Sequence, residues 1–228
     1  MSIVPKTYPR SSALILLVTP VVVFVSFLAH PHVGTRVGEP GVAEAIAHAV
    51  AASPAVWALS HLALAVGSAF VALAFLALRA HLRTAGGERW SAFGVPFAVL
   101  GSVLFALLPA MEMGALAAHR AGASVAAFQQ GLDPYFAPVL LAGSAVFAVG
   151  AVAFAQALRR TEAFAPALGR LMAVGLVVVA ASRFVPVFPV LFWVQSAGLA
   201  LAFWPAAYAL WSRAGAGRAA AREQRAPA

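Results

Sequence analysis

The chain of 228 residues contains no cysteine. This absence excludes disulfide bonds, thiolate metal ligands, a cysteine nucleophile and a covalently attached c-type haem. Charge is also scarce, because Asp, Glu, Lys and Arg together make up only 10% of the residues, whereas an ordinary globular domain has about 25%. The composition therefore argues against a water-soluble globular domain.

Several catalytic and binding motifs are missing as well. The sequence has no H-E-x-x-H motif, no Gly-rich phosphate loop and no serine nucleophile motif. Its one lysine, Lys6, precedes the first apolar stretch, so no lysine is available at membrane depth for a retinal Schiff base. These absences remove the motif-defined zinc proteases, nucleotide-binding proteins and serine hydrolases from consideration.

Hydrophobic residues dominate what remains, at 63% of the chain with a mean hydropathy of +0.92. The net charge is +8, but the basic residues punctuate apolar segments and form no stripe on a polar surface, so we expect no nucleic-acid partner. Arginine far outnumbers lysine and alanine is abundant, which suggests a GC-rich bacterial source. The expected partner is a lipid bilayer, in the bacterial cytoplasmic membrane.

Six apolar stretches are long enough to cross a hydrocarbon core of about 30 Å. They are Ser11–Ala29, Ala55–Leu78, Ser91–Met113, Tyr135–Leu158, Leu168–Phe188 and Pro189–Trp211. We therefore predict an all-α integral membrane bundle of six transmembrane helices in residues 1–212. Residues 213–228 form an Arg-rich tail, which we expect to be cytoplasmic and disordered.

The distribution of basic residues predicts the orientation of the bundle. If the N-terminus is cytoplasmic, twelve of the fifteen Lys and Arg residues lie on the cytoplasmic side and three, Arg36, Arg120 and Arg183, on the other. Cytoplasmic segments carry the excess of Lys and Arg in membrane proteins. Both termini are therefore predicted to be cytoplasmic.

The two longer outer connections each contain a short amphipathic pattern. Apolar residues recur near four-residue spacing in His30–Pro54 and again in His119–Pro134. Both patterns predict short helices lying on the outer surface, the second of them ended by Gly131 and Pro134. Loops that cover the mouth of a site would lie on this face.

A weak internal repeat joins two of the predicted spans. The pattern Pro96-x4-Gly101-Ser102-x2-Phe105 recurs 42 residues later as Pro138-x4-Gly143-Ser144-x2-Phe147. Gly and Ser are common wherever membrane helices pack closely, so we favour chance recurrence over duplication.

Four polar residues from four predicted spans share one depth. Counting 1.5 Å per residue from the predicted helix ends places His61, Glu112, Arg183 and Gln195 roughly 8–11 Å below the outer boundary, with Ser26 slightly higher. Ionisable groups at membrane depth usually face the protein interior and have a partner or a function. We interpret the four as a ligand-binding layer.

Two interpretations of this layer are compatible. In the structural one, Glu112 and Arg183 form a buried ion pair, and His61 and Gln195 complete the hydrogen bonds that hold the bundle in register. In the functional one, a cavity open to the outer side binds a small polar or anionic head group. Arg183 would then recognise the anion, and Glu112 with His61 would exchange a proton.

Five of the six histidines fall on the predicted outer side, which raises the question of a metal. The candidate metal ligands outside the polar layer are His30, His32, Glu44, His48 and His119. Four imidazoles and one carboxylate suit zinc or copper, although the sequence contains no known metal-binding motif. Haem b would have a single histidine ligand at depth, His61.

Three functional hypotheses follow. The first is a polytopic membrane protein that binds or transports a small ligand or lipid head group in an outward-facing polar pocket. The second is a membrane-embedded redox or metal-dependent enzyme that uses His61 and Glu112. The third is a structural subunit that pairs with copies of itself or with other proteins in a membrane complex.

Overall fold

A computed structural model describes residues 10–31, 39–83, 88–185 and 187–223, except for the side chains of residues 88, 188–190 and 213–223. The described part of the chain contains seven α-helices joined by short turns and loops. They are α1 (Arg10–Ala29), α2 (Val42–Ala52), α3 (Pro54–Leu82), α4 (Glu88–Arg120), α5 (Val125–Arg160), α6 (Pro166–Ser182) and α7 (Phe188–Glu223).

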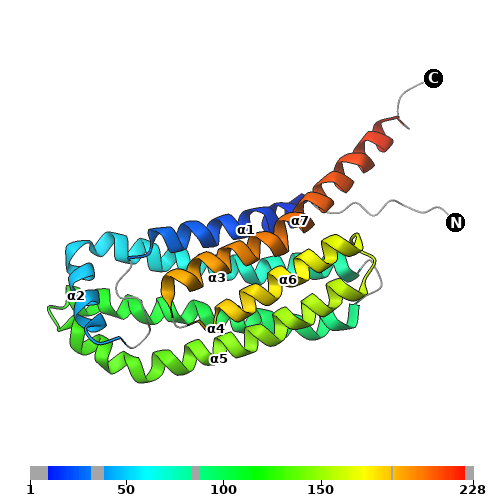
Figure 1. Ribbon diagram of the computed structural model, residues 1–228. Coiled ribbons are helices and arrows are strands. Elements are labelled where there is room, and N and C mark those ends of the chain that lie inside the picture. The colour runs from blue at the N-terminus through cyan, green and yellow to red at the C-terminus, as the bar shows by residue number, and fades with distance from the viewer. Residues whose placement is uncertain (1–9, 32–38, 84–87, 186, 224–228) are drawn as a thin grey trace.

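All the helices except α2 form a closed ring. Each packs against the next along the chain, from α1 to α3, α4, α5, α6 and α7, and α7 returns to α1. The short turn between α4 and α5 forces these two helices into antiparallel contact. Figure 1 shows the helices running along one common axis, with the start of α1 and the C-terminal turns of α7 at the same end.

Aromatic side chains fill the centre of this ring. Phe75 of α3 is fully buried and meets Phe147 and Phe154 of α5 and Phe203 of α7 edge-on, with ring centroids 4.9–5.6 Å apart. Edge-to-face geometry is the preferred arrangement of aromatic pairs. One residue of α3 thus joins three helices of the bundle.

The outer faces of the same helices are apolar. Large hydrophobic side chains are exposed at helical spacing, for example Leu59, Leu62, Leu73 and Leu76 along α3. Apolar patches of this extent are characteristic of protein or membrane interfaces. Four helices are long and apolar enough to cross a membrane, namely α1, α3, α4 from Arg89 onward, and α5. The chain is therefore an all-helical protein with the features of a membrane protein.

The remaining two predicted spans correspond to α6 and α7. Helix α6 is apolar but has only 17 residues, or about 25 Å at 1.5 Å per residue, which is short of a core of about 30 Å. Helix α7 contains the stretch predicted as the sixth span and continues to Glu223, into the segment treated above as a tail. The count of six spans stays a prediction.

The first of the two predicted short helices is confirmed as α2. Its buried residues Ile46 and Val50 pack in one cluster with Trp57 of α3 and Ala115 of α4. Figure 1 shows α2 across the end of the bundle opposite the start of α1. Helix α2 therefore covers part of this end of the ring, where it packs against α3, α4 and α5.

The predicted break in the second outer connection is wrong. Helix α5 begins at Val125, where the Ser124 hydroxyl caps the Ala127 amide, and continues unbroken through Gly131, Pro134 and Pro138. A proline inside a helix removes one backbone hydrogen bond. Membrane helices tolerate this loss where neighbouring helices support the segment, and α5 packs here against both α2 and α4.

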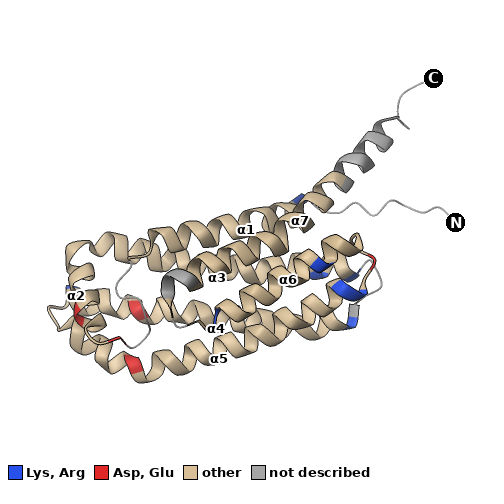
Figure 2. Ribbon diagram, viewed as in Figure 1, with Lys and Arg blue, Asp and Glu red and all other residues tan. Residues whose placement is uncertain are grey.

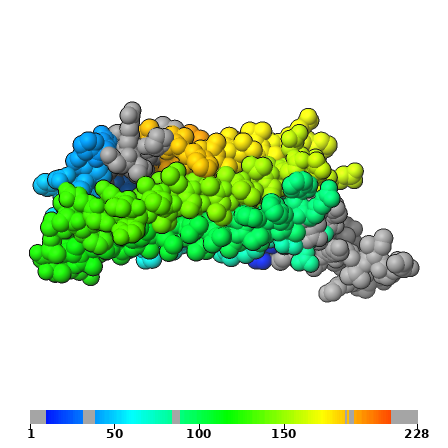
Figure 3. Space-filling model, turned by 90° about the horizontal axis from the view of Figure 1, so that it is seen from below, coloured from blue at the N-terminus to red at the C-terminus, as the bar shows by residue number. Residues whose placement is uncertain are grey.

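The two copies of the weak repeat pack against each other. A Cβ on Gly101 would lie 2.6 Å from the Phe147 backbone, and one on Gly143 would lie 3.5 Å from the Phe105 backbone nitrogen. The contact between α4 and α5 is thus reciprocal, each glycine admitting the phenylalanine segment of the other copy. Figure 3 shows α4 and α5 side by side along one long face of the molecule.

Candidate functional site

A cavity of about 130 Å³ lies inside the ring, at the end covered by α2. Most of its wall is apolar, and includes Val23, Phe27, Leu108 and Phe192. The charged and amide side chains in the wall are His30, Glu112, Gln129, Asp133, Arg183 and Gln195. A mainly apolar cavity with a few convergent polar groups is the usual form of a small-molecule site.

Arg183 is held in this wall by two phenylalanines. Its guanidinium carbon lies 3.6 Å from the ring centroid of Phe147 and 4.2 Å from that of Phe105, the equivalent residues of the two repeat copies. The Ser144 hydroxyl donates a hydrogen bond of 3.2 Å to the Arg183 carbonyl. The residue is therefore fixed in position by both α4 and α5.

The charge of Arg183 is not balanced by any described residue. The side chain is only 3% exposed, and its Nε and Nη1 atoms have no hydrogen-bond partner within the described ranges. Arginine keeps its charge in proteins, and a buried charge is costly unless it is paired. Cation–π contacts stabilise a desolvated cation by about 2 kcal/mol, but they leave the N–H groups at Nε and Nη1 without acceptors.

Two glutamine side chains add unpaired polar atoms to the same wall. Gln129 of α5 and Gln195 of α7 are 5% and 2% exposed, and the Oε1 atom of each has no partner among the described residues. A glutamine amide offers both donors and an acceptor. The mainly apolar wall of the cavity therefore contains three side chains with unpartnered polar atoms, those of Gln129, Arg183 and Gln195.

A second set of contacts connects α3 and α4 at His61. Its Nε2 lies 2.8 Å from Oε2 of Glu112, and its Nδ1 lies 2.7 Å from the Trp57 carbonyl. The Trp57 indole in turn donates a hydrogen bond of 3.2 Å to the Glu112 carbonyl. Both His61 and Trp57 are fully buried, so this network has a fixed geometry.

The hydrogen-bond roles imply that the His61–Glu112 pair holds one proton. A backbone carbonyl only accepts, so the hydrogen on the His61 ring at Nδ1 is donated to Trp57. Nε2 of a neutral ring and Oε2 of a carboxylate would then face each other as two acceptors. A proton on either one makes the 2.8 Å contact a hydrogen bond between α3 and α4.

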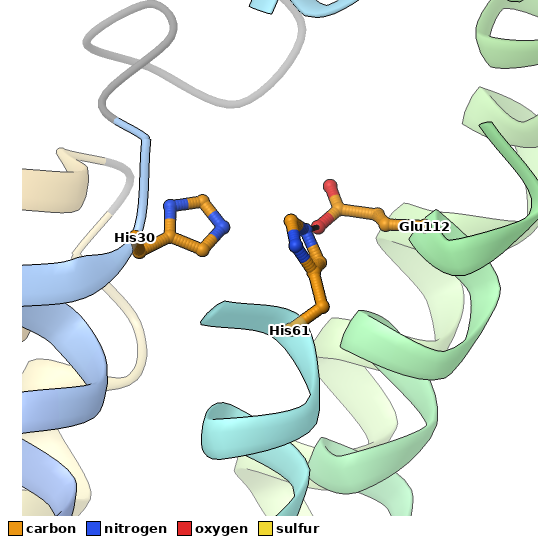
Figure 4. Close-up of side chains that lie close together, drawn as sticks. All are labelled: His30, His61 and Glu112. Atoms are coloured by element: carbon orange, nitrogen blue, oxygen red, sulfur yellow. Dashed lines mark hydrogen bonds and ion pairs between the residues drawn. The ribbon is translucent and has the colours of Figure 1, made fainter. Parts of the chain in front are cut away.

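His30 completes a group of three on the cavity side. It follows the last turn of α1, and its ring centroid lies 4.8 Å from that of His61. The ligand atoms of His30, His61 and Glu112 all lie within 4.8 Å of one another. Figure 4 shows His61 between His30 and Glu112, with the three side chains coming from three different helices or helix ends.

The predicted polar layer is partly brought together. Glu112, Arg183 and Gln195 line one cavity, and His61 lies against Glu112. The predicted ion pair between Glu112 and Arg183 is wrong for the described residues, in which Glu112 pairs with His61 instead. The predicted end of this span at Phe188 is also wrong, because α6 ends at Ser182 and Arg183 is its C-cap.

The predicted metal residues are dispersed. Only His30 belongs to the group of three, and His32 lies outside the described residues. Glu44 and His48 are exposed on α2, and His119 is half-buried near the end of α4. Glu44, His48 and His119 are not part of the group of three found among the described residues. A metal role for these three residues stays a prediction.

Two wall residues were missed by the sequence reasoning. Gln129 and Asp133 both line the cavity from α5. Their four-residue spacing places them on one helix face, and this signal was hidden by the expected helix end at Pro134. A continuous helix through the proline would have brought both into the candidate site.

Comparisons with known proteins give no relative to support an assignment. The chain matches no family model, and no curated protein or solved structure is significantly similar to it.

Proposed function

We propose that this chain is a membrane protein that binds a small anionic ligand, or the anionic head group of a lipid, in the cavity between its helices. The observation that carries the proposal is the buried Arg183 guanidinium, which lines a cavity and whose Nε and Nη1 atoms lack an acceptor among the described residues. The charge selects an anion, and the planar group suits the paired oxygens of a carboxylate or phosphate.

The size and walls of the cavity narrow the ligand further. A cavity of roughly 150 Å³ lined by apolar side chains takes up benzene, and the cavity here has about 130 Å³. A ligand with an anionic head and a small apolar body therefore fits best. Gln195 and Gln129 would hydrogen-bond the head group beside Arg183.

The membrane setting of this function rests on the apolar helices. We infer six spans, with both termini in the cytoplasm of a bacterial cell and the cavity opening to the outer side. Two observations support this inference. The helices other than α2 form a closed ring, and most of the arginines fall on the predicted cytoplasmic side of the membrane. Figure 2 shows most of the visible Lys and Arg at the end where α1 begins.

The test compares the thermal stability of purified wild type and Arg183→Met with benzoate and with neutral benzamide. Binding to the native state raises stability by about 2.7 kcal/mol when the ligand reaches 100 times its Kd. Benzoate is expected to raise the unfolding temperature of the wild type but not of Arg183→Met, and benzamide to raise neither. An equal response of both proteins to benzoate would contradict the proposal.

The unliganded stability of the same variant separates binding from a purely structural role. Replacing a buried, uncompensated charge by an apolar side chain is often neutral or stabilising, whereas loss of a structural contact lowers stability. Arg183→Met is therefore expected to unfold at the same or a higher temperature than wild type. A lower unfolding temperature together with an unchanged ligand response would favour the structural-subunit hypothesis.

The presence or absence of a co-purified phospholipid distinguishes a lipid ligand from a free anion. Native mass spectrometry of wild type in detergent detects a co-purified phospholipid if the head group of a lipid is the ligand. Benzoate would then displace it. A protein free of lipid that still binds benzoate indicates a soluble anion.

A membrane-embedded metal-dependent enzyme is the second candidate, because His30, His61 and Glu112 are grouped at the cavity. An absorbance spectrum of the purified protein tests the haem variant of this hypothesis, since haem gives a Soret band.

A further inference from the structure

We propose that His30, His61 and Glu112 form a binding site for one divalent transition-metal ion, with zinc as the metal that suits it best. Two imidazoles and one carboxylate are the protein ligands of a common class of catalytic zinc site, which leaves a fourth position for water or substrate. This site is separate from the Arg183 anion site and does not depend on it.

The hydrogen bonding of His61 is that of a metal ligand. Metal-binding histidines usually donate the other ring N–H to a backbone carbonyl or carboxylate, which fixes the ring orientation. The Nδ1 of His61 makes this contact with the Trp57 carbonyl at 2.7 Å. Its Nε2 is thereby directed at Oε2 of Glu112, 2.8 Å away.

The distances allow a tetrahedral site after small movements of His30 toward the other two ligands and of Glu112 Oε2 away from His61 Nε2, now 2.8 Å apart. Zinc binds imidazole nitrogen at about 2.0–2.1 Å, so two ligand atoms of a tetrahedral site lie roughly 3.3 Å apart. The three ligand atoms here lie within 4.8 Å of one another. His30 is half-buried and follows the end of α1, where side-chain rotation can close the difference.

The open position of this metal would face the cavity. His30 and Glu112 are both wall residues, whereas His61 is fully buried against Trp57. Nitrogen and oxygen ligands without sulfur suit zinc and also iron(II) and manganese(II). A ligand entering the cavity would therefore meet the metal as well as Arg183.

The experiment uses the full chain in detergent without a histidine tag, stripped with a chelator and then titrated with Zn²⁺ against a chromophoric chelator. One zinc per chain is expected. Removing one of three ligands should weaken binding more than the roughly 10–100-fold that loss of a supporting hydrogen bond costs. His30→Gln and Glu112→Gln are therefore each expected to lower zinc affinity by more than ~100-fold.

Two histidines outside the group serve as controls. His48→Gln on α2 and His119→Gln near the end of α4 are expected to bind zinc as the wild type does. Cobalt(II) is a second readout, because in a four-coordinate site it absorbs visible light much more strongly than in water. This signal in the wild type decides the question if a ligand variant fails to fold.

Absence of stoichiometric zinc together with a water-like cobalt spectrum in the wild type would overturn the proposal. So would an equal loss of zinc affinity in His48→Gln and His30→Gln. Arg183→Met is expected to retain one zinc per chain while losing its response to benzoate. Failure of the metal proposal is thus separable from failure of the anion-binding proposal.

Discussion

At the scale of single residues, Trp57 determines the geometry around the candidate site. It is fully buried, its carbonyl accepts from His61, and its indole N–H donates to the Glu112 carbonyl. Its ring also lies 4.2 Å from the His61 ring. One residue therefore orients the histidine and holds α3 against α4 where Glu112 projects.

Replacing Trp57 by Phe tests this role. The variant keeps the backbone carbonyl but loses the hydrogen bond to Glu112 and part of a buried ring. We expect a loss of about 2 kcal/mol or more from these two effects together, seen as a lower unfolding temperature in detergent. Trp193→Phe is the matched control, because Trp193 is 56% exposed. Equal effects of the two substitutions would show that Trp57 has no special role.

At the scale of helices, the close approach of α4 and α5 brings one phenylalanine from each helix into contact with Arg183. Gly101 and Gly143 let the helices touch through their backbones, as small residues do in membrane bundles. Phe105 and Phe147 are thereby both brought into contact with the guanidinium. Wider spacing of the two helices would move the phenylalanines away from the Arg183 guanidinium.

Gly101→Ala is expected to destabilise the bundle. The added Cβ would lie 2.6 Å from the Phe147 Cα, and overpacking of this kind costs about 1–3 kcal/mol. Gly131→Ala is the control in α5, because nothing lies within 4 Å of a Cβ there. It should be neutral or stabilise by up to ~1 kcal/mol through higher helix propensity. Thermal unfolding of both variants in detergent measures the difference, and a stable Gly101→Ala would refute the close contact.

At the scale of the whole molecule, the long sides of the bundle are apolar, whereas its two ends contain most of the charged residues. The long sides carry exposed leucines and valines. Figure 2 shows most of the visible acidic residues toward the α2 end and most basic ones toward the other. This asymmetry agrees with a transmembrane orientation that follows the positive-inside rule.

The absence of cysteine makes this orientation directly measurable. Ala121 and Glu162 are exposed in the turns that flank α5, one at each end of a candidate membrane span. Ala121→Cys is expected to react with a membrane-impermeant maleimide in intact cells, and Glu162→Cys only after permeabilisation. Reversed labelling would invert the predicted orientation, and labelling of both in intact cells would show that α5 does not cross the membrane.

The sequence by itself determined the helical class and the apolar character of the chain. Long apolar stretches leave no alternative to helices, because a backbone in lipid must satisfy its own hydrogen bonds. The pattern of Val42, Ile46 and Val50 likewise predicted α2. Counting along these stretches also identified Glu112, Arg183 and Gln195, which share one cavity wall.

Only the tertiary structure decided which of these polar residues meet. Whether a helix continues through Pro134 or stops at Ser182 depends on packing against neighbouring helices. Helix ends predicted from proline positions were therefore wrong at both places, and the one at Pro134 hid Gln129. The pairing of Glu112 with His61, and the approach of His30, depend on the rotation of α1, α3 and α4 about their axes. Side-chain partners across helices are set by that rotation and by close glycine contacts, neither of which spacing along a single helix can specify.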